Sequence, residues 1–186
     1  MPFTFVSGNL ALDFAGTMQH RDTAPMELLS SPALLREWWT VAGLVDQPPE
    51  VSEAEFAGAL AVREAVYRLA LAAATGGERS QADVDLLNRA AAAAPVTALL
   101  TRDGVRRTGP ADAVVASIAR DAVGLLGGPD AARIRECEDP PCTRLFVDIS
   151  RAGSRRWCDM SGCGNRAKAA GFRARRTAAR PVGDRG

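Results

Sequence analysis

Apolar residues recur at helical intervals in four segments of the first two thirds of the chain, separated by polar and glycine-rich stretches. Three of these segments follow a residue that can cap a helix: Ser31, Ser52 paired with Glu55, and Ser80. Spacings of three and four place one apolar stripe on each helix, and that stripe is buried in a core. The pattern predicts helices over residues 32–42, 53–75, 81–93 and 111–126.

Weaker patterns cover two further segments. Asn9 to Thr17 fits a strand, because alternate residues are apolar, and also a helix, because Leu10 and Phe14 share one helical face; we favour the helix. Residues 97–108 alternate around an Asp-Gly dipeptide that is typical of tight turns, and they predict a small β-hairpin. For the adjacent pair Trp38-Trp39 we expect one ring in the core and the other half exposed.

All four cysteines lie in the last third of the chain, in two pairs with the same spacing. Four residues separate Cys137 from Cys142, another four separate Cys158 from Cys163, and 15 residues connect the pairs. Two short chelating loops of this kind bring four thiolates to one point, as a tetrahedral divalent ion requires. The spacing does not match iron-sulfur clusters, so Zn²⁺ is favoured over iron. We therefore expect a closed zinc site.

Two disulfides are the alternative interpretation of these cysteines. They suit a small exported protein, but residues 1–5 have neither the basic start nor the long apolar run of a signal peptide. In the reducing cytoplasm, paired cysteines more often bind metal than each other. No apolar run approaches the ~20 residues that span a bilayer. The expectation is a cytoplasmic zinc protein without a membrane partner.

The segments around the cysteines predict a small zinc-binding fold. Alternating apolar residues predict a strand over 144–150, Gly153 permits a turn, and 155–158 would return as a second strand. Alanine and arginine then favour a helix from Cys163 towards Arg180, with Phe172 facing the metal core. The order of loop, hairpin, loop and helix is treble-clef-like.

Charge changes along the chain where the composition changes. Residues 1–130 carry 10 basic and 16 acidic side chains, a formal charge of −6, whereas residues 131–186 carry 13 and 6, a charge of +7. A basic module beside an acidic one indicates a polyanion partner. We expect a mainly α protein: a multi-helix N-terminal domain with a small β-hairpin over residues 1–128, and a treble-clef-like zinc finger over residues 129–186.

A stripe of arginines follows one face of the predicted C-terminal helix. At 100° per residue, four arginines fall within about 80° of one another around the helix axis: Arg166, Arg173, Arg176 and Arg180. Guanidinium groups in a row suit phosphate oxygens, through bidentate hydrogen bonds and counterion release. The alternative is a solvated face that balances the negative zinc–thiolate cluster. The candidate nucleic-acid contacts, on this helix and just before it, are Arg155, Arg156, Arg166, Arg173, Arg176 and Arg180.

Three motifs around the cysteines resemble the CGNR zinc finger: Phe146-Val-Asp148, Arg155-Arg-Trp-Cys158 and Cys163-Gly-Asn-Arg166. The preceding region, notably Asn9 to Phe14 and Leu34 to Leu44, is similar to the mainly helical ABATE domain. The resemblance implies zinc bound by all four cysteines in a bacterial transcription regulator linked to stress.

Three classes of function follow from these features. The first is a zinc-dependent DNA-binding transcriptional regulator whose N-terminal domain senses a small-molecule ligand or forms a homodimer. The second is a protein–protein interaction module with a structural zinc site and no direct DNA contact. An enzyme is disfavoured, because four thiolates leave no open position for water and the N-terminal two thirds of the sequence have no Walker, GxGxxG, HExxH or GxSxG motif.

Overall fold

A computed structural model describes residues 3–178 of the 186-residue chain; the side chains of residues 174 and 176–178 are not described. About 51% of the chain is helical, and the strands form antiparallel pairs. The helices are α1 (Leu10–Ala15), α2 (Pro32–Val41), α3 (Glu53–Thr75), α4 (Gln81–Ala92), α5 (Ala111–Gly127) and α6 (Asn165–Ala178), with short turns η1 (Pro129–Arg133) and η2 (Met160–Gly164). The strands are β1 (Met18–Gln19), β2 (Met26–Glu27), β3 (Thr97–Thr101), β4 (Gly104–Thr108), β5 (Ile134–Glu136) and β6 (Leu145–Val147). The mainly α prediction is confirmed.

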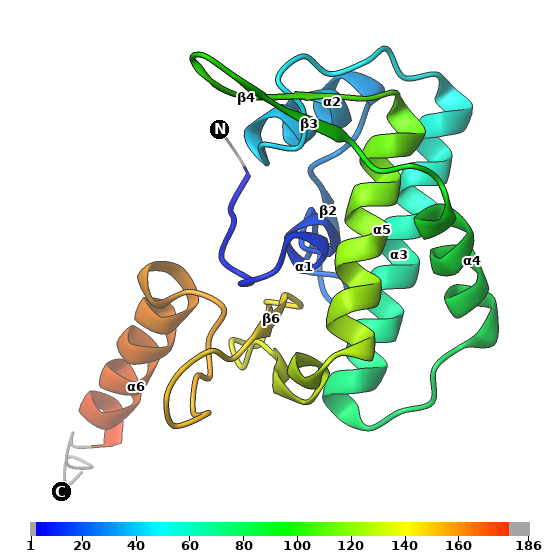
Figure 1. Ribbon diagram of the computed structural model, residues 1–186. Helices are drawn as coiled ribbons and strands as arrows, with labels where there is room; N and C mark the ends of the chain where they lie inside the picture. The colour runs from blue at the N-terminus through cyan, green and yellow to red at the C-terminus, as the bar shows by residue number, and fades with distance from the viewer. Residues whose placement is uncertain (1–2, 179–186) are drawn as a thin grey trace, which may run out of the picture.

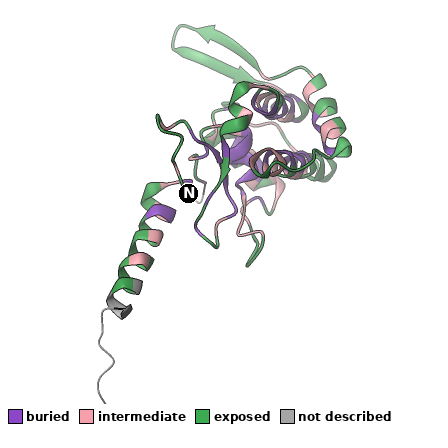
Figure 2. Cartoon of the chain, turned by 90° about the horizontal axis from the view of Figure 1, so that it is seen from below, coloured by how far each residue is buried: buried purple, intermediate pink, exposed green. Residues whose placement is uncertain are grey.

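Helices α3, α4 and α5 lie side by side, and α1 packs against α3 and α5 (Figure 1). Phe14, Val66, Leu69 and Ile118 are among the side chains buried between them. The β3–β4 hairpin projects beyond this layer, and α6 extends away from the body (Figures 1 and 2). Within residues 3–178, none of the helices combines the length and the apolar character needed to cross a lipid bilayer.

The predicted helix caps form as expected. The side chains of Ser31 and Ser80 accept hydrogen bonds from the backbone three residues later, and Ser52 forms a complete capping box with Glu55. Gly76 ends α3 in the left-handed conformation, with φ 72°. All four helix predictions are confirmed; these local signals explain three of them, whereas α5 begins after Pro110 without a side-chain cap.

The two weaker patterns are also resolved. The segment after Asn9 is a helix, because the Asn9 side chain caps it by accepting a hydrogen bond from the Leu12 backbone N–H at 3.1 Å. The hairpin over residues 97–108 is confirmed as β3 and β4. The expectation for the tryptophans is wrong, since Trp38 and Trp39 are both buried. The N-terminal segment (residues 3–7) folds back over α2, and the ring of Phe5 stacks on Trp38, with the ring centres 5.7 Å apart.

The predicted pairing of residues 144–150 with 155–158 is wrong. Strand β6 pairs instead with β5, so that Ile134 is opposite Val147 and Glu136 is opposite Leu145. Residues 155–158 form no strand. Strand β6 pairs with the upstream strand β5 because the loop from Cys137 to Cys142 forms the turn between them.

The β5–β6 hairpin completes the core of the helical region. Ile134, Leu145 and Val147 are buried in the same apolar cluster as Phe14 and Leu69. Both strands contact α3, and β6 also contacts α1. The cysteine-rich region is therefore packed onto the helices through an apolar interface.

A network of ion pairs links α3 to the β1–β2 segment. Arg63, which is buried, donates two hydrogen bonds of 2.7 Å to the carboxylate of Glu27 and one of 2.9 Å to Glu64. Glu64 also pairs with Arg21, whose guanidinium lies 3.8 Å from the centre of the Tyr67 ring. A buried arginine without partners is strongly destabilising. The carboxylates of Glu27 and Glu64 therefore stabilise the fold by pairing with Arg63.

Replacing Ile134 by alanine tests the shared core. Ile134 is fully buried, so I134A should lower the free energy of unfolding by about 2–5 kcal/mol. Chemical denaturation followed by circular dichroism of the helices measures the change. I149A is the matched control, because Ile149 is 67% exposed and its truncation should cost less than about 0.5 kcal/mol. A helix transition that does not move in I134A would contradict a core shared by the two regions.

Candidate metal centre

The four cysteines predicted as ligands meet at one point. Their sulfur atoms all lie within 4.8 Å of one another, and all four are free thiols. The Cys142–Cys158 and Cys158–Cys163 sulfur distances are 3.8 and 3.6 Å. A tetrahedron with zinc–sulfur bonds of about 2.3 Å has an edge of about 3.8 Å. The cluster can therefore hold a tetrahedral metal ion, consistent with Zn²⁺.

The β5–β6 hairpin holds the first pair of ligands. The Cys137 N–H donates to the Arg144 carbonyl at 3.0 Å, which continues the ladder past the end of β5. The Cys142 N–H donates to the Asp139 carbonyl at 2.7 Å and closes a tight turn that contains two prolines. Because proline restricts the backbone, the turn presents Cys137 and Cys142 as a preformed pair.

The second pair of ligands is held by the turn that leads into α6. The Asp159 carboxylate accepts a hydrogen bond from the Gly162 N–H at 2.7 Å, and the Asp159 carbonyl accepts one from the Gly164 N–H at 2.9 Å. These contacts wind η2 into a π-helical turn that continues as α6. Cys163 therefore lies near the N-terminal end of a helix, where the helix dipole favours a thiolate.

The pKa values of the four thiols depend on one another, because the sulfur atoms lie so close together. Hydrogen bonds from the Cys142 and Cys158 thiols lower the pKa of Cys137, and the hydrogen bond to Cys137 raises the pKa of Cys142 and of Cys158. Burial raises the pKa of Cys163 to about 12. Four thiolates this close would repel one another unless a cation balanced them. Zn²⁺ supplies two positive charges at the point where they are needed.

Arg166 joins the two metal loops from the first turn of α6. Its guanidinium donates hydrogen bonds of 2.9 and 2.6 Å to Asp139 Oδ2 and one of 3.0 Å to Cys163 Sγ. The Cys158 backbone N–H donates to Cys137 Sγ at 3.4 Å. Donors of this kind orient ligand sulfur atoms and offset their charge. The arginine of the CGNR motif is therefore part of the metal centre.

Arg155 faces the interior. Its guanidinium donates hydrogen bonds of 2.9 Å to the carbonyls of Val6 and Trp157, a further one to the Cys158 carbonyl, and lies 4.5 Å from the centre of the Phe146 ring. The side chain thus ties the loop before Cys158 to the N-terminal segment. This arginine stabilises the metal region from inside.

The other candidate arginines lie at the surface or on α6. Arg156 is exposed, and its guanidinium donates to Glu138 at 2.6 Å. Arg173 is an exposed residue of α6. Arg176 belongs to the same helix but its side chain is not described, and Arg180 lies outside the described residues. The structure brings Arg155 and Arg166 to the metal loops and places Arg173 farther along the helix.

Helix α6 leaves the body of the protein soon after Cys163 (Figure 2). Its main contacts are with the η2 turn. Phe172, expected at the metal core, is 55% exposed, so that expectation is wrong. The cause is the direction of the helix, which carries all but its first turn away from the sulfur atoms.

The segment before α1 (residues 3–7, the N-terminal segment) lies against the metal region. The Val147 N–H donates to the Ser7 carbonyl at 2.8 Å, and the buried guanidinium of Arg144 donates to the Thr4 hydroxyl at 2.8 Å. Arg144 also donates to the Gly16 carbonyl at 3.4 Å. A Cβ at position 16 would lie 2.5 Å from the Arg144 guanidinium, so this packing requires glycine there.

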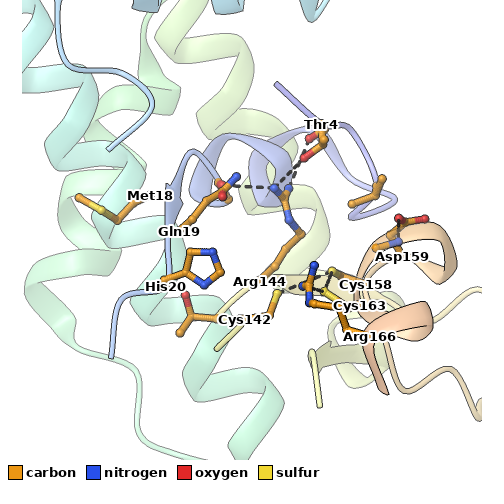
Figure 3. Close-up of a pocket in the computed structure, with 14 residues that line it drawn as sticks. Thr4, Met18, Gln19, His20, Cys142, Arg144, Cys158, Asp159, Cys163 and Arg166 are labelled. Carbon is orange, nitrogen blue, oxygen red and sulfur yellow. Dashed lines mark hydrogen bonds between the residues drawn. The ribbon is translucent and has the colours of Figure 1, made fainter. Parts of the chain in front are cut away.

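A cavity of about 220 Å³ separates the start of the helical region from the metal loops (Figure 3). Thr4, His20 and Arg144 lie in its wall together with the ligands Cys142 and Cys158. Cys142 is the least buried of the four cysteines. Small polar solutes can therefore approach the metal centre from this side.

Three residues of the centre were assigned no role from the sequence: Asp139, Arg144 and Asp148, although Asp148 ends the Phe146-Val-Asp148 motif. Asp148 accepts hydrogen bonds from the Ser150 and Arg155 N–H groups at 2.9 and 3.0 Å and so shapes the loop before the second cysteine pair. Asp139 lies inside the first chelating loop, which was the available signal for it. The partners of Arg144 lie 128 and 140 positions away, and no local pattern indicates them.

Metal content tests the four-thiolate centre directly. Protein purified under reducing conditions should carry one equivalent of zinc by elemental analysis, and C163S should carry close to none, because three thiolates leave the tetrahedral site incomplete. M160L changes the same turn without removing a ligand and should retain the metal. Full zinc content in C163S would exclude the proposed ligand set.

Zinc affinity tests the contribution of Arg166. Because its guanidinium donates to both Asp139 and the Cys163 sulfur, R166A should bind zinc about 10–100-fold more weakly in competition with a chelating dye. K168A removes a positive charge two residues away and is the matched control. Equal losses in the two variants would show that Arg166 acts only through general charge.

Comparison with known families agrees with this geometry. Residues 8–129 match the ABATE family, which is described as "Putative stress-induced transcription regulator", and residues 133–176 match the CGNR zinc finger. No curated protein matches the sequence. The second matched range contains all four cysteines of the metal centre. The chain belongs to the ABATE family and carries a CGNR zinc finger in its C-terminal third.

Proposed function

We propose that this protein is a zinc-dependent, DNA-binding transcriptional regulator. In this function the zinc centre sets the direction of α6, α6 contacts the phosphates of DNA, and the helical region senses a ligand. The family description and the zinc finger support a regulatory role. Direct contact with DNA goes beyond them and needs its own support.

The charge of α6 carries this proposal. From Asn165 to Ala178 the helix contains five basic residues and no acidic one. The basic side chains that are described, those of Arg166, Lys168, Arg173 and Arg175, are all exposed. A projecting cationic helix offers several guanidinium groups to phosphate oxygens, and binding would release counterions from the DNA.

The metal centre would orient this helix. Cys163 lies in the turn that leads into α6, and Arg166 binds Asp139 of the opposite metal loop. Asp139 has only 7% of its side chain exposed, so Arg166 keeps this partner and offers its remaining N–H groups to DNA. Arg156 pairs with Glu138 at the surface, where exchanging the carboxylate for phosphate costs little.

One of the arginines predicted to contact phosphate, Arg155, has a different role in the proposed function. Arg155 is assigned a positioning role, because its guanidinium is engaged by backbone carbonyls. The contact set is therefore Arg156, Arg166, Arg173, Arg176 and Arg180.

A sensing role for the helical region is supported by the cavity beside the metal loops. Its wall combines residues of both regions, including His20 and Cys142. The His20 ring, in the wall of this cavity, contacts the Pro141 carbonyl of the first metal loop directly. A ligand bound there would touch the metal loops and the helical region together, and would thereby alter the orientation of α6.

Two double variants of α6 test DNA contact. On an ideal helix, Arg173 and Arg176 lie on one face and Lys168 and Arg175 on the other. R173A/R176A should weaken binding of labelled duplex DNA and reduce the slope of log K against log salt by about 2. Fluorescence anisotropy of the zinc-loaded protein at several salt concentrations measures both quantities.

The second double variant, K168A/R175A, removes the same charge from the opposite face and is the matched control. It should keep most of the affinity. Equal losses in both variants would contradict a contact face, and affinity that does not change with salt would contradict phosphate binding altogether.

A protein partner is the second candidate, and the exposure of Phe172 favours it. This aromatic ring lies among the arginines of α6 and is 55% exposed. Aromatic and arginine side chains together are typical of binding hot spots. Retention of a partner after nuclease treatment, lost in F172A and combined with no affinity for DNA, would favour this function over the first.

A further inference from the structure

The β3–β4 hairpin, residues 97–108, is an arm that the rest of the protein does not cover. Every residue of both strands is exposed, including Leu100 at 88% and Leu99 and Val105 at about half. Figure 2 shows the arm as a fully exposed projection. A leucine near a hairpin tip contributes nothing to the core of its own chain, so its exposure indicates an interaction surface.

The register of the strands places Leu100, Val105 and Ala98 on one face of the hairpin, whereas Leu99, paired with Arg106, lies on the other. Leu100 is paired with Val105, and Ala98 with Arg107, so these residues share a face of the hairpin. The arm is tied to the body at its base, where Asp46 exchanges two hydrogen bonds, of 2.9 and 3.1 Å, with the backbone of Arg107. A lone two-stranded hairpin is marginally stable in water. A partner on the apolar face would stabilise the arm.

The charge of the arm is opposite to that of the region that carries it. Arg102, Arg106 and Arg107 outnumber Asp103, which gives the arm a formal charge of +2, whereas residues 1–130 as a whole carry −6. Electrostatic complementarity therefore directs the arm towards a surface like that of its own helical region.

Such a surface is present where α3, α4 and α5 meet. A groove of about 360 Å³ is lined mainly by small and aliphatic side chains, among them Ala59, Val62, Ala90 and Val115. Glu55, Asp112 and one arginine, Arg89, stand at this groove. Its apolar floor suits a leucine and a valine, and its two carboxylates suit the arginines of the arm.

The arm cannot enter the groove of its own chain. Strand β4 ends at Thr108, and Ala111 and Asp112, which line the groove, follow almost at once. Five residues of strand carry the tip about 17 Å from the base. The tip is therefore directed away from the groove beside its base and into the solvent.

We propose that two copies of this chain form a symmetric dimer in which the β3–β4 arm of each copy lies in the α3–α4–α5 groove of the other. Each chain has one arm and one groove, so a two-fold axis allows each arm to bind the groove of the other copy. The exposed Leu100 favours protein over nucleic acid as the partner of the arm, because an aliphatic side chain gains little binding free energy from contact with phosphate. This dimer is independent of DNA binding by α6.

The test uses the full zinc-loaded chain and two variants that act on opposite sides of the contact. L100D places a charge on the apolar face of the arm. G58L fills the groove, and no atom lies within 4 Å of a Cβ at Gly58, so leucine fits α3 without strain and should stabilise the monomer. Sedimentation equilibrium over a concentration series should give twice the chain mass of 19.6 kDa for the wild type. Each variant should raise the dissociation constant at least about tenfold.

Matched controls make the same changes elsewhere. G124L places leucine at another helical glycine with open space around its Cβ, outside the groove, and I149D charges another exposed aliphatic residue. Both should remain dimers. A wild type that is monomeric throughout the series would overturn the proposal, and so would a dimer that tolerates G58L, since the arm would then bind elsewhere. Weaker DNA binding by L100D with unchanged mass would show the arm to be a nucleic-acid contact and would also overturn it.

Discussion

Four sulfur atoms held within 4.8 Å of one another cannot all carry negative charge unless a cation lies among them. This requirement organises the C-terminal third of the protein. The β5–β6 hairpin presents Cys137 and Cys142, and the η2 turn presents Cys158 and Cys163. Few apolar contacts join the two loops, so the metal ion connects them together with the hydrogen bonds of Arg166 to Asp139 and Cys163. Binding free energy of the ion is then also folding free energy of this region.

The metal region is at the same time part of a larger core. Ile134, Leu145 and Val147 of the hairpin lie in the cluster that the helices build, whereas Phe146 points to the other side and packs with the cysteines. One short strand therefore carries the helical core on one face and the metal cluster on the other. A change at the sulfur atoms reaches the helices through a single layer of backbone, which gives the proposed coupling between ligand sensing and α6 a physical basis.

Much of this arrangement could be predicted from sequence where the signal is local. Ser31 and the Ser52–Glu55 pair cap helices through contacts three residues apart, and the cysteine spacing indicated the ligands without any knowledge of the fold. Predictions failed where a distant segment decides the outcome. The strand at Leu145–Val147 was recognised but its partner was not. The alternation of apolar and polar residues indicates which side chains are buried, but not which strand pairs with it. The exposure of the Trp38-Trp39 pair and of Phe172 was misjudged, because the N-terminal segment covers Trp38 and the direction of α6 exposes Phe172.

The hydrogen bond from Arg155 to the Val6 carbonyl spans 149 positions, and that from Arg144 to Thr4 spans 140. Translation at about 5–20 residues per second separates the appearance of these partners by roughly 7–30 s. Throughout that interval residues 3–7 lack the strand edge on which they belong, while the long helices can already associate. The zinc-binding region can close only after Cys163 has been synthesised, so residues 3–7 find their partners only when a segment about 140 positions later is present.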